Sequence, residues 1–187
     1  MPDRLASIAL IETPIGRLWL SGTDAGLLLI TRSDGPEPHV AALSARRHTT
    51  LADAALLAES LDQLDAYFRG DLRSFDLRLD LRGVAAFHAA VYRAAMEIPY
   101  GETASYGEVA GMAGSPRAAR AVGRAMAACP LFPVVPCHRV IHGDGSIRGW
   151  GVDPWVKLWL LDHERLRDGR PSPSTSSSVI DVSRAQW

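Results

Sequence analysis

The period of the hydrophobic pattern changes along the chain, and this change limits the folds that the chain can adopt. Short apolar runs (SIALIE, GRLWLSG, GLLLITRS) are separated by turn signals over residues 7–32, which is typical of a strand meander. Residues 53–69 place leucines at helical spacing ahead of Gly70. In residues 74–81 polar and apolar residues alternate, which predicts another strand. The pattern predicts an α+β unit with a small antiparallel sheet over residues 1–82.

Helical spacing dominates the second half of the chain. It predicts a helix over residues 85–98, a pair of helices over 105–128 and a last helix over 154–169. A mostly helical domain is therefore expected over residues 83–168. The final residues, 169–187, are rich in Ser and Pro without periodicity, so we expect a disordered tail.

The predicted pair of helices has the features of a helix-turn-helix. Ser105 and Glu108 fit a capping box at the start of the first helix. Gly114 closes that helix, and Ser115 caps the second one with Pro116 in its first turn. Such pairs bind DNA in many proteins and occur in plain helical cores as well.

The second helix of the pair is rich in arginine and alanine. Arg117, Arg120 and Arg124 are spaced i, i+3 and i+7, which predicts that one face carries all three. The small residues that would let this helix approach a nucleic-acid groove are Ala119, Ala121 and Ala125.

The chain has a net charge of −1, but the charge is unevenly distributed. Residues 1–85 carry 9 Arg and 12 acids, a net charge of −3, whereas residues 115–150 carry five Arg and one Asp, a net charge of +4. A cationic face of this size suits a modest phosphate footprint, so we expect weak, salt-sensitive DNA binding. A solvated arginine face without a ligand accounts for the charge equally well.

Other features exclude several classes of protein. The N-terminus MPDRLASIAL lacks the apolar run of a signal peptide, and no stretch approaches the roughly 20 apolar residues of a membrane span, so we expect a cytoplasmic protein. Cys129 and Cys137 are too few for a disulfide framework, and their spacing matches no zinc signature. We therefore expect no metal, and ask whether either thiol is reactive.

The segment VPCHRV (135–140) carries the strongest chemical signal. A free thiol with a pKa of about 8.5 is a poor nucleophile at neutral pH unless a base or a positive charge assists it. His138 can accept the proton of Cys137, directly or through one water, if a carboxylate such as Glu164 fixes its tautomer. A buried cysteine beside an unrelated imidazole is the competing interpretation.

The segment and its surroundings resemble the 6-O-alkylguanine-DNA alkyltransferases, also called methylated-DNA-protein-cysteine methyltransferases. The matching blocks, in order, are IPYGETASYGEVA (98–110), SPRAARAVGRAM (115–126), VVPCHRVI (134–141) and VKLWLLDHE (156–164). The resemblance implies a ribonuclease H-like N-terminal domain and a winged helix-turn-helix-like C-terminal domain that carries the active site.

The resemblance also implies a role for each matching residue. Cys137 would accept the alkyl group, with His138 as the base acting through water and Glu164 as the orienting acid. Tyr106 would donate a hydrogen bond or proton to the departing guanine, and Arg120 would replace the flipped nucleotide in the duplex. The acceptor would be consumed in one irreversible turnover, without a cofactor, on 6-O-alkylguanine and possibly 4-O-alkylthymine.

The expected partner is alkylated duplex DNA, approached from the minor groove by a monomer without an obligate protein partner. The residues expected to contact DNA are Arg120, Ser115, Arg117, Ala119, Arg124 and Arg139. The residues expected to line the substrate pocket are Pro136, Val140, Trp150, Gly151 and Val152.

One residue and one loop depart from the family pattern. Cys129 stands where an Asn usually ties the helix pair to the active-site turn, and sulfur is a weak hydrogen-bonding group. The usual Gly-Tyr-small-Gly-Gly run appears here as GWGVD (149–153). Our hypothesis is that this altered loop changes the relative rates on benzylated and methylated guanine.

Two other functions compete with alkyl transfer. Non-catalytic alkyltransferase-like proteins bind alkylated DNA and signal to other repair pathways, but they carry another residue, often Trp, where this chain has Cys137. A Cys-His hydrolase would need an oxyanion hole and would turn over an ester or amide.

Overall fold

The computed structural model describes residues 4–51, 54–147 and 153–167. The chain forms two compact units, one of residues 1–89 with 129–135 and the other of residues 90–128 with 136–187. The predicted boundary near residue 82 stays a prediction. The predicted tail, 169–187, lies outside the described residues.

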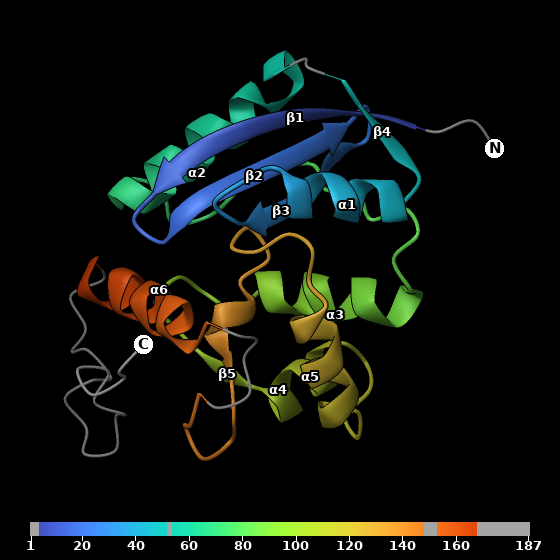
Figure 1. The fold of residues 1–187 in the computed structure, drawn as a ribbon. Coiled ribbons are helices and arrows are strands. Elements are labelled where there is room, and N and C mark those ends of the chain that lie inside the picture. The colour runs from blue at the N-terminus through green and yellow to red at the C-terminus, as the bar shows by residue number, and fades with distance from the viewer. Residues whose placement is uncertain (1–3, 52–53, 148–152, 168–187) are drawn as a thin grey trace. The chain divides into compact units, whose positions relative to one another are not determined.

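The first unit contains the predicted meander, which is confirmed. Its strands are β1 (Arg4–Thr13), β2 (Gly16–Thr23) and β3 (Gly26–Arg32), and both neighbouring pairs are antiparallel (Figure 1). Gly16 and Gly26 have φ values of 102° and 129° at the two turns, a region that favours glycine. A Cβ on Gly26 would lie 2.2 Å from the carbonyl oxygen of Arg78, so this turn also needs glycine for space.

The sheet has a fourth strand that the sequence pattern did not reveal. Strand β4 (His48–Leu51) pairs parallel with β1, giving the order β3-β2-β1-β4. Helix α1 (Glu37–Ala45) precedes it and was also missed. Its His39 is fully buried, and Nε2 lies 2.6 Å from the hydroxyl of Ser21, so a polar pair anchors α1 to β2.

The predicted helix over 53–69 is present as a short 3-10 turn (Ala54–Leu57) followed by α2 (Ala58–Arg69), which ends at left-handed Gly70 as expected. The predicted strand over 74–81 is wrong. Only Leu79 forms a bridge, with Leu27. Gln63 of α2 satisfies the backbone of Asp76 instead, because its amide donates to Asp76 O (3.0 Å) and accepts from Asp76 N (2.8 Å).

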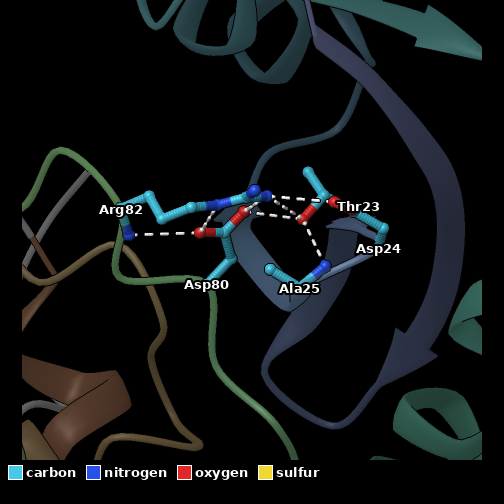
Figure 2. A network of polar contacts seen from close by, with 5 residues as sticks. All are labelled: Thr23, Asp24, Ala25, Asp80 and Arg82. Carbon is cyan, nitrogen blue, oxygen red and sulfur yellow. Dashed lines mark hydrogen bonds and ion pairs between the residues drawn. The ribbon is translucent and has the colours of Figure 1, made fainter.

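A charged network holds the end of this segment against the β2–β3 turn. Figure 2 shows Thr23 and Arg82 converging on the carboxylate of Asp80. That carboxylate accepts hydrogen bonds from Thr23 Oγ1 (2.6 Å) and from Arg82 Nη2 (2.6 Å) and Nε (2.8 Å). Burial alone would raise the pKa of Asp80, but these donors outweigh burial and lower it from 3.8 to about 2.

Helix α3 (Ala86–Met96) leads into the second unit, and the helix predicted over 85–98 is thereby confirmed. The other elements are β5 (Ala104–Ser105), α4 (Tyr106–Met112), α5 (Ala119–Ala127), a 3-10 turn η2 (Cys137–Arg139), β6 (Val140–Ile141) and α6 (Pro154–Arg167). Strands β5 and β6 form a parallel pair. Within the described part of the chain, none of the helices combines the length and the hydrophobicity of a membrane-spanning segment.

The helix pair α4–α5 is present, and its first helix begins as predicted. The Ser105 hydroxyl accepts from Glu108 N (3.1 Å), and the Glu108 carboxylate accepts from Ser105 N (2.6 Å), which completes the capping box. Gly114 closes α4 with a φ of 73°.

The second helix starts later than predicted. The backbone N–H of Ser115 donates back to Ala110 O (2.8 Å), and that of Ala118 donates to Ser115 O (2.9 Å). This extra turn delays α5 to Ala119, so the predicted Ser115 cap is wrong, and Arg117 lies in the turn rather than on the helix. One face of α5 therefore presents Arg120 and Arg124 without Arg117.

Replacing Asp80 with Asn should lower the free energy of unfolding by about 2 kcal/mol, because charge-assisted hydrogen bonds to a buried carboxylate are removed. Since folding lowers the pKa of Asp80, the contribution of this carboxylate to the free energy of unfolding is present above about pH 4 and is lost as the pH falls toward 2. Urea denaturation between neutral and acidic pH measures both effects. Asp24→Asn is the matched control, because the Asp24 side chain is 89% exposed; equal losses in the two variants would contradict the prediction.

Candidate active site

The reactive cysteine lies in a short buried turn. Residues Cys137–Arg139 form η2, closed by the bond from Arg139 N to Pro136 O (2.9 Å). The Cys137 side chain is buried, and the neighbouring His138 is fully enclosed. The turn leads directly into β6, which pairs with β5 ahead of α4. The chain thus holds the thiol on a fixed backbone inside the second unit.

Glu164 of α6 is the centre of the polar interactions around this turn. Its Oε1 lies 2.7 Å from His138 Nε2 and accepts from Arg139 Nη2 at 3.0 Å. Its Oε2 accepts from Arg139 Nε at 2.9 Å and from Gly101 N at 3.1 Å. The carboxylate is fully buried, and it links α6, the turn and the loop after α3.

The charges of this cluster set the protonation of its members. Burial opposes ionisation of Glu164, but the charges and hydrogen bonds of His138 and Arg139 outweigh burial and hold its pKa below its usual range. Burial lowers the pKa of His138, although Glu164 favours the protonated ring. A neutral imidazole that donates Nε2–H to Glu164 leaves Nδ1 as a proton acceptor, which is the tautomer that a base needs.

The structure does not support the predicted DNA contact of Arg139. We expected it to contact DNA, but it is buried and its guanidinium is directed inward. Besides its two bonds to Glu164, it donates from Nη1 to Ile98 O (2.7 Å) and lies 5.7 Å from the centre of the Tyr100 ring. The guanidinium is therefore used in holding the turn, because a buried carboxylate needs a cationic partner.

Tyr106 begins α4 beside the reactive turn. Its pKa is raised by burial and by the nearby Cys137, so the phenol keeps its proton. Its ring contacts the ring of His142 edge-on, with the two ring centres 5.2 Å apart. The His142 ring therefore packs against one side of the Tyr106 ring that carries the hydroxyl.

Lys157 is a site residue that sequence reasoning missed. Its side chain is fully buried, and Nζ donates to Val140 O (2.6 Å), the residue that follows the reactive turn. Two signals could have found it: it is the chain's single lysine among 19 arginines, and it lies two helical turns before Glu164.

The remaining predicted residues fall into three groups. Arg117, Arg120 and Arg124 are exposed, and Ser115 and Ala119 are half-buried. Ala125, expected to face a groove, is instead fully buried, and Tyr92 donates to its carbonyl (3.2 Å). Pro136 and Val140 are buried and flank the turn that contains Cys137, whereas Trp150, Gly151 and Val152 lie outside the described residues.

Neither cysteine forms a disulfide in the structure, and Cys129 is half-buried. Among the described residues, no group of three or more His, Cys, Asp or Glu side chains is placed to hold a metal ion. The described residues bring the thiol of Cys137 together with a neighbouring histidine–carboxylate pair, His138 and Glu164, joined at 2.7 Å.

Comparison with known proteins identifies the family. Residues 86–166 match the 6-O-methylguanine DNA methyltransferase, DNA binding domain, and residues 8–81 match the ribonuclease-like domain of the same enzymes. A methylated-DNA–protein-cysteine methyltransferase of Mycobacterium tuberculosis is 43% identical over 158 residues, which are 84% of this chain and 91% of that protein. The chain belongs to the 6-O-methylguanine DNA methyltransferase family.

Two further relatives of this methyltransferase family member are informative. The crystal structure of Mycobacterium tuberculosis OGT in complex with DNA aligns with a TM-score of 0.74 at 39% identity, over 90% of this chain and 96% of that one. A DNA base-flipping protein of Thermus thermophilus is 37% identical over 82% of this chain and 97% of its own. The predicted α+β fold, with a ribonuclease-like domain and a helical DNA-binding domain, is thereby confirmed.

Replacing Glu164 with Gln in this methyltransferase should lower the free energy of unfolding by about 3 kcal/mol, because Arg139 then keeps a buried charge without its counterion. Since folding depresses the pKa of Glu164, its contribution is present at neutral pH and lost in acid. Chemical denaturation at neutral pH measures the loss. Glu108→Gln in the exposed capping box is the control, and a loss no larger than that of the control would contradict the assignment.

Proposed function

We propose that this chain repairs alkylated DNA by moving a methyl or larger alkyl group from the 6-oxygen of guanine to Cys137. The observation that carries the proposal is the buried thiol of Cys137 next to a His138–Glu164 pair joined at 2.7 Å. The family membership supports the same activity, since the relatives are named as methyltransferases that use a protein cysteine.

Activation of the thiol starts from the His138–Glu164 pair. Glu164 holds Nε2–H of His138, so Nδ1 takes the proton of Cys137, directly or through one water. The imidazolium that forms is stabilised by the anionic carboxylate beside it. Arg139 keeps that carboxylate ionised. His138 acts as the base, and Glu164 as its orienting acid.

The transfer step is a displacement at the alkyl carbon. The sulfur of Cys137 forms a new S–C bond while the bond from that carbon to the guanine oxygen breaks, and the electron pair stays with guanine. Tyr106 donates a hydrogen bond or its proton to the departing base, since its raised pKa keeps the phenol protonated at neutral pH. The thioether has no easy route back, so each molecule reacts once. The same chemistry suits 4-O-alkylthymine.

The target oxygen is paired inside a duplex, so the nucleotide must leave the stack, which costs a few kcal/mol. Arg120 on the exposed face of α5 fills the vacated space, and Arg124 and Arg117 contact phosphates. The small side chain of Ala119 allows α5 to approach the minor groove. Ser115 lies in the turn between the helices, where its polar atoms can reach the DNA backbone.

The reaction needs a reduced thiol, so the protein acts in the cytoplasm, where cysteines stay reduced. It works as a monomer and needs no cofactor, because the thiol supplies the nucleophile and the histidine–carboxylate pair the base. The substrate pocket includes Pro136 and Val140 beside the thiol. Trp150, Gly151 and Val152 remain a sequence-based assignment to the same pocket.

A non-catalytic role in flagging alkylated bases is the alternative, and the similarity to a DNA base-flipping protein favours it as the second candidate. Retention of Cys137 in a buried turn beside a base argues for transfer instead. The two functions differ in whether the protein changes mass.

Mixing the protein with an oligonucleotide that contains 6-O-methylguanine should add one methyl group to the chain, because the thioether is stable. Intact-mass spectrometry measures the gain. Cys137→Ala should gain nothing and Cys129→Ala should gain the same group as the wild type. A wild type that binds the oligonucleotide without gaining mass would overturn transfer and support the flagging role.

Replacing Arg124 with Ala should weaken DNA binding for all sequences alike. Removing one arginine–phosphate interaction should reduce the slope of log affinity against log salt by about 0.9 on duplex DNA. Fluorescence anisotropy over a range of salt concentrations measures the slope. Arg73→Ala, an exposed arginine of the first unit, is the control; an unchanged slope in Arg124→Ala would remove this arginine from the DNA interface.

A further inference from the structure

His142, whose side chain has no part in the proposed transfer step, contacts the ring of Tyr106. Tyr106 directly follows β5, and His142 directly follows β6, the parallel partner of that strand. The centres of the two rings lie 5.2 Å apart, and their planes meet at 67°. This is the edge-to-face geometry that stabilises aromatic pairs. An aromatic contact therefore joins the start of α4 to the loop after β6.

The backbone of His142 is fixed by the loop that it begins. Its N–H donates to Ser146 O (3.0 Å), and its carbonyl accepts from Gly145 N (2.9 Å). Gly145 has a φ of 79°, a region that favours glycine, and Ser146 N donates to the Asp144 carboxylate (2.9 Å). Because both backbone polar groups of His142 are bonded within the loop, its ring is presented to Tyr106 from a fixed support.

Helix α5 also lies against the Tyr106 ring. A Cβ built on Gly123 would lie 3.9 Å from Cε1 and 4.0 Å from Cδ1 of that ring, which is ordinary van der Waals contact. Only a methyl-sized space therefore separates α5 from this edge of the ring. Gly123 follows Arg120 by three residues on α5, the helix proposed to enter the DNA groove. The Tyr106 ring is thus confined both by the DNA-binding helix and by His142.

We propose that His142 is a positioning residue for alkyl transfer, whose ring holds the Tyr106 ring in the orientation from which the phenol reaches the departing guanine. The inference rests on the proposed transfer to Cys137, in which Tyr106 donates to that base. A donor that is already aimed loses no rotamer freedom during the reaction, and such preorganised donors accelerate reactions. His142 exchanges no proton in this role and acts through the contact of its ring.

Removing the ring of His142 should slow the chemical step. His142→Ala should lower the rate of methyl transfer from a 6-O-methylguanine oligonucleotide about fivefold, the factor expected for one aromatic contact. His142→Phe keeps an aromatic ring without an ionisable group, so it should keep the wild-type rate and the wild-type pH profile. Single-turnover mass spectrometry measures the rates. A loss in His142→Phe as large as that in His142→Ala would overturn the proposal.

A double-mutant cycle separates positioning from a merely structural role. Tyr106→Phe has no hydroxyl to aim, so adding His142→Ala to it should cause no further loss of rate. An equal loss in the wild-type and Tyr106→Phe backgrounds would overturn the proposal. Gly143→Ala is the control in the same loop, because its added Cβ would meet no atom within 4 Å. It should leave the rate unchanged.

The ring contact can also be followed without DNA. Protein labelled with 3-fluorotyrosine carries fluorine on its four tyrosines, and the signal that disappears in Tyr106→Phe identifies Tyr106. His142→Ala should shift this signal in 19F NMR, because the ring loses a neighbouring aromatic group, and Gly143→Ala should not. An unchanged Tyr106 signal in His142→Ala would overturn the proposal.

These measurements distinguish this inference from the proposed function. If the wild type gains no methyl group, alkyl transfer fails, and the 19F comparison still decides whether His142 holds the Tyr106 ring. If the wild type reacts and His142→Ala reacts as fast, the inference about His142 fails alone. If His142→Ala does not fold, His142→Phe decides through its rate and its pH profile.

Discussion

The buried carboxylate of Glu164 is the interaction on which the rest of the site depends. A charge without solvent is costly, and here four hydrogen bonds from His138, Arg139 and Gly101 offset that cost. These bonds fix the imidazole beside Cys137 and join α6 to the reactive turn. The same carboxylate thus organises the local fold and defines which nitrogen of His138 can take a proton.

Much of the fold follows from periodicity, and the failures have physical causes. The meander and the helices with clear apolar spacing were predictable, because the spacing of apolar residues in each segment shows which of its faces is buried. Polar and apolar residues alternate over 74–81 as in a strand, yet the backbone of Asp76 bonds to the Gln63 side chain of α2 and not to a neighbouring strand. Only the tertiary contacts reveal this pairing. Strand β4 has four residues, and such a short segment carries little pattern of its own.

The site was partly predictable for a related reason. Cys137, His138 and Glu164 stand in recognisable motifs, and their grouping needed only the assumption that α6 returns to the turn. The inward direction of Arg139 could not be read from the sequence, because an arginine beside a histidine serves a DNA face and a buried carboxylate equally well. Lys157 was missed because the helical pattern of residues 154–167 was read from the apolar residues around it.

The proposed repair reaction requires that the buried sulfur of Cys137, and no other atom of the chain, receives the alkyl group. Fragmentation mass spectrometry of peptides from protein reacted with 6-O-methylguanine DNA locates the modified atom. We expect one methyl group on Cys137, with Cys129 unmodified. A methyl group on Cys129 or on any other side chain, with Cys137 intact, would rule out Cys137 as the acceptor.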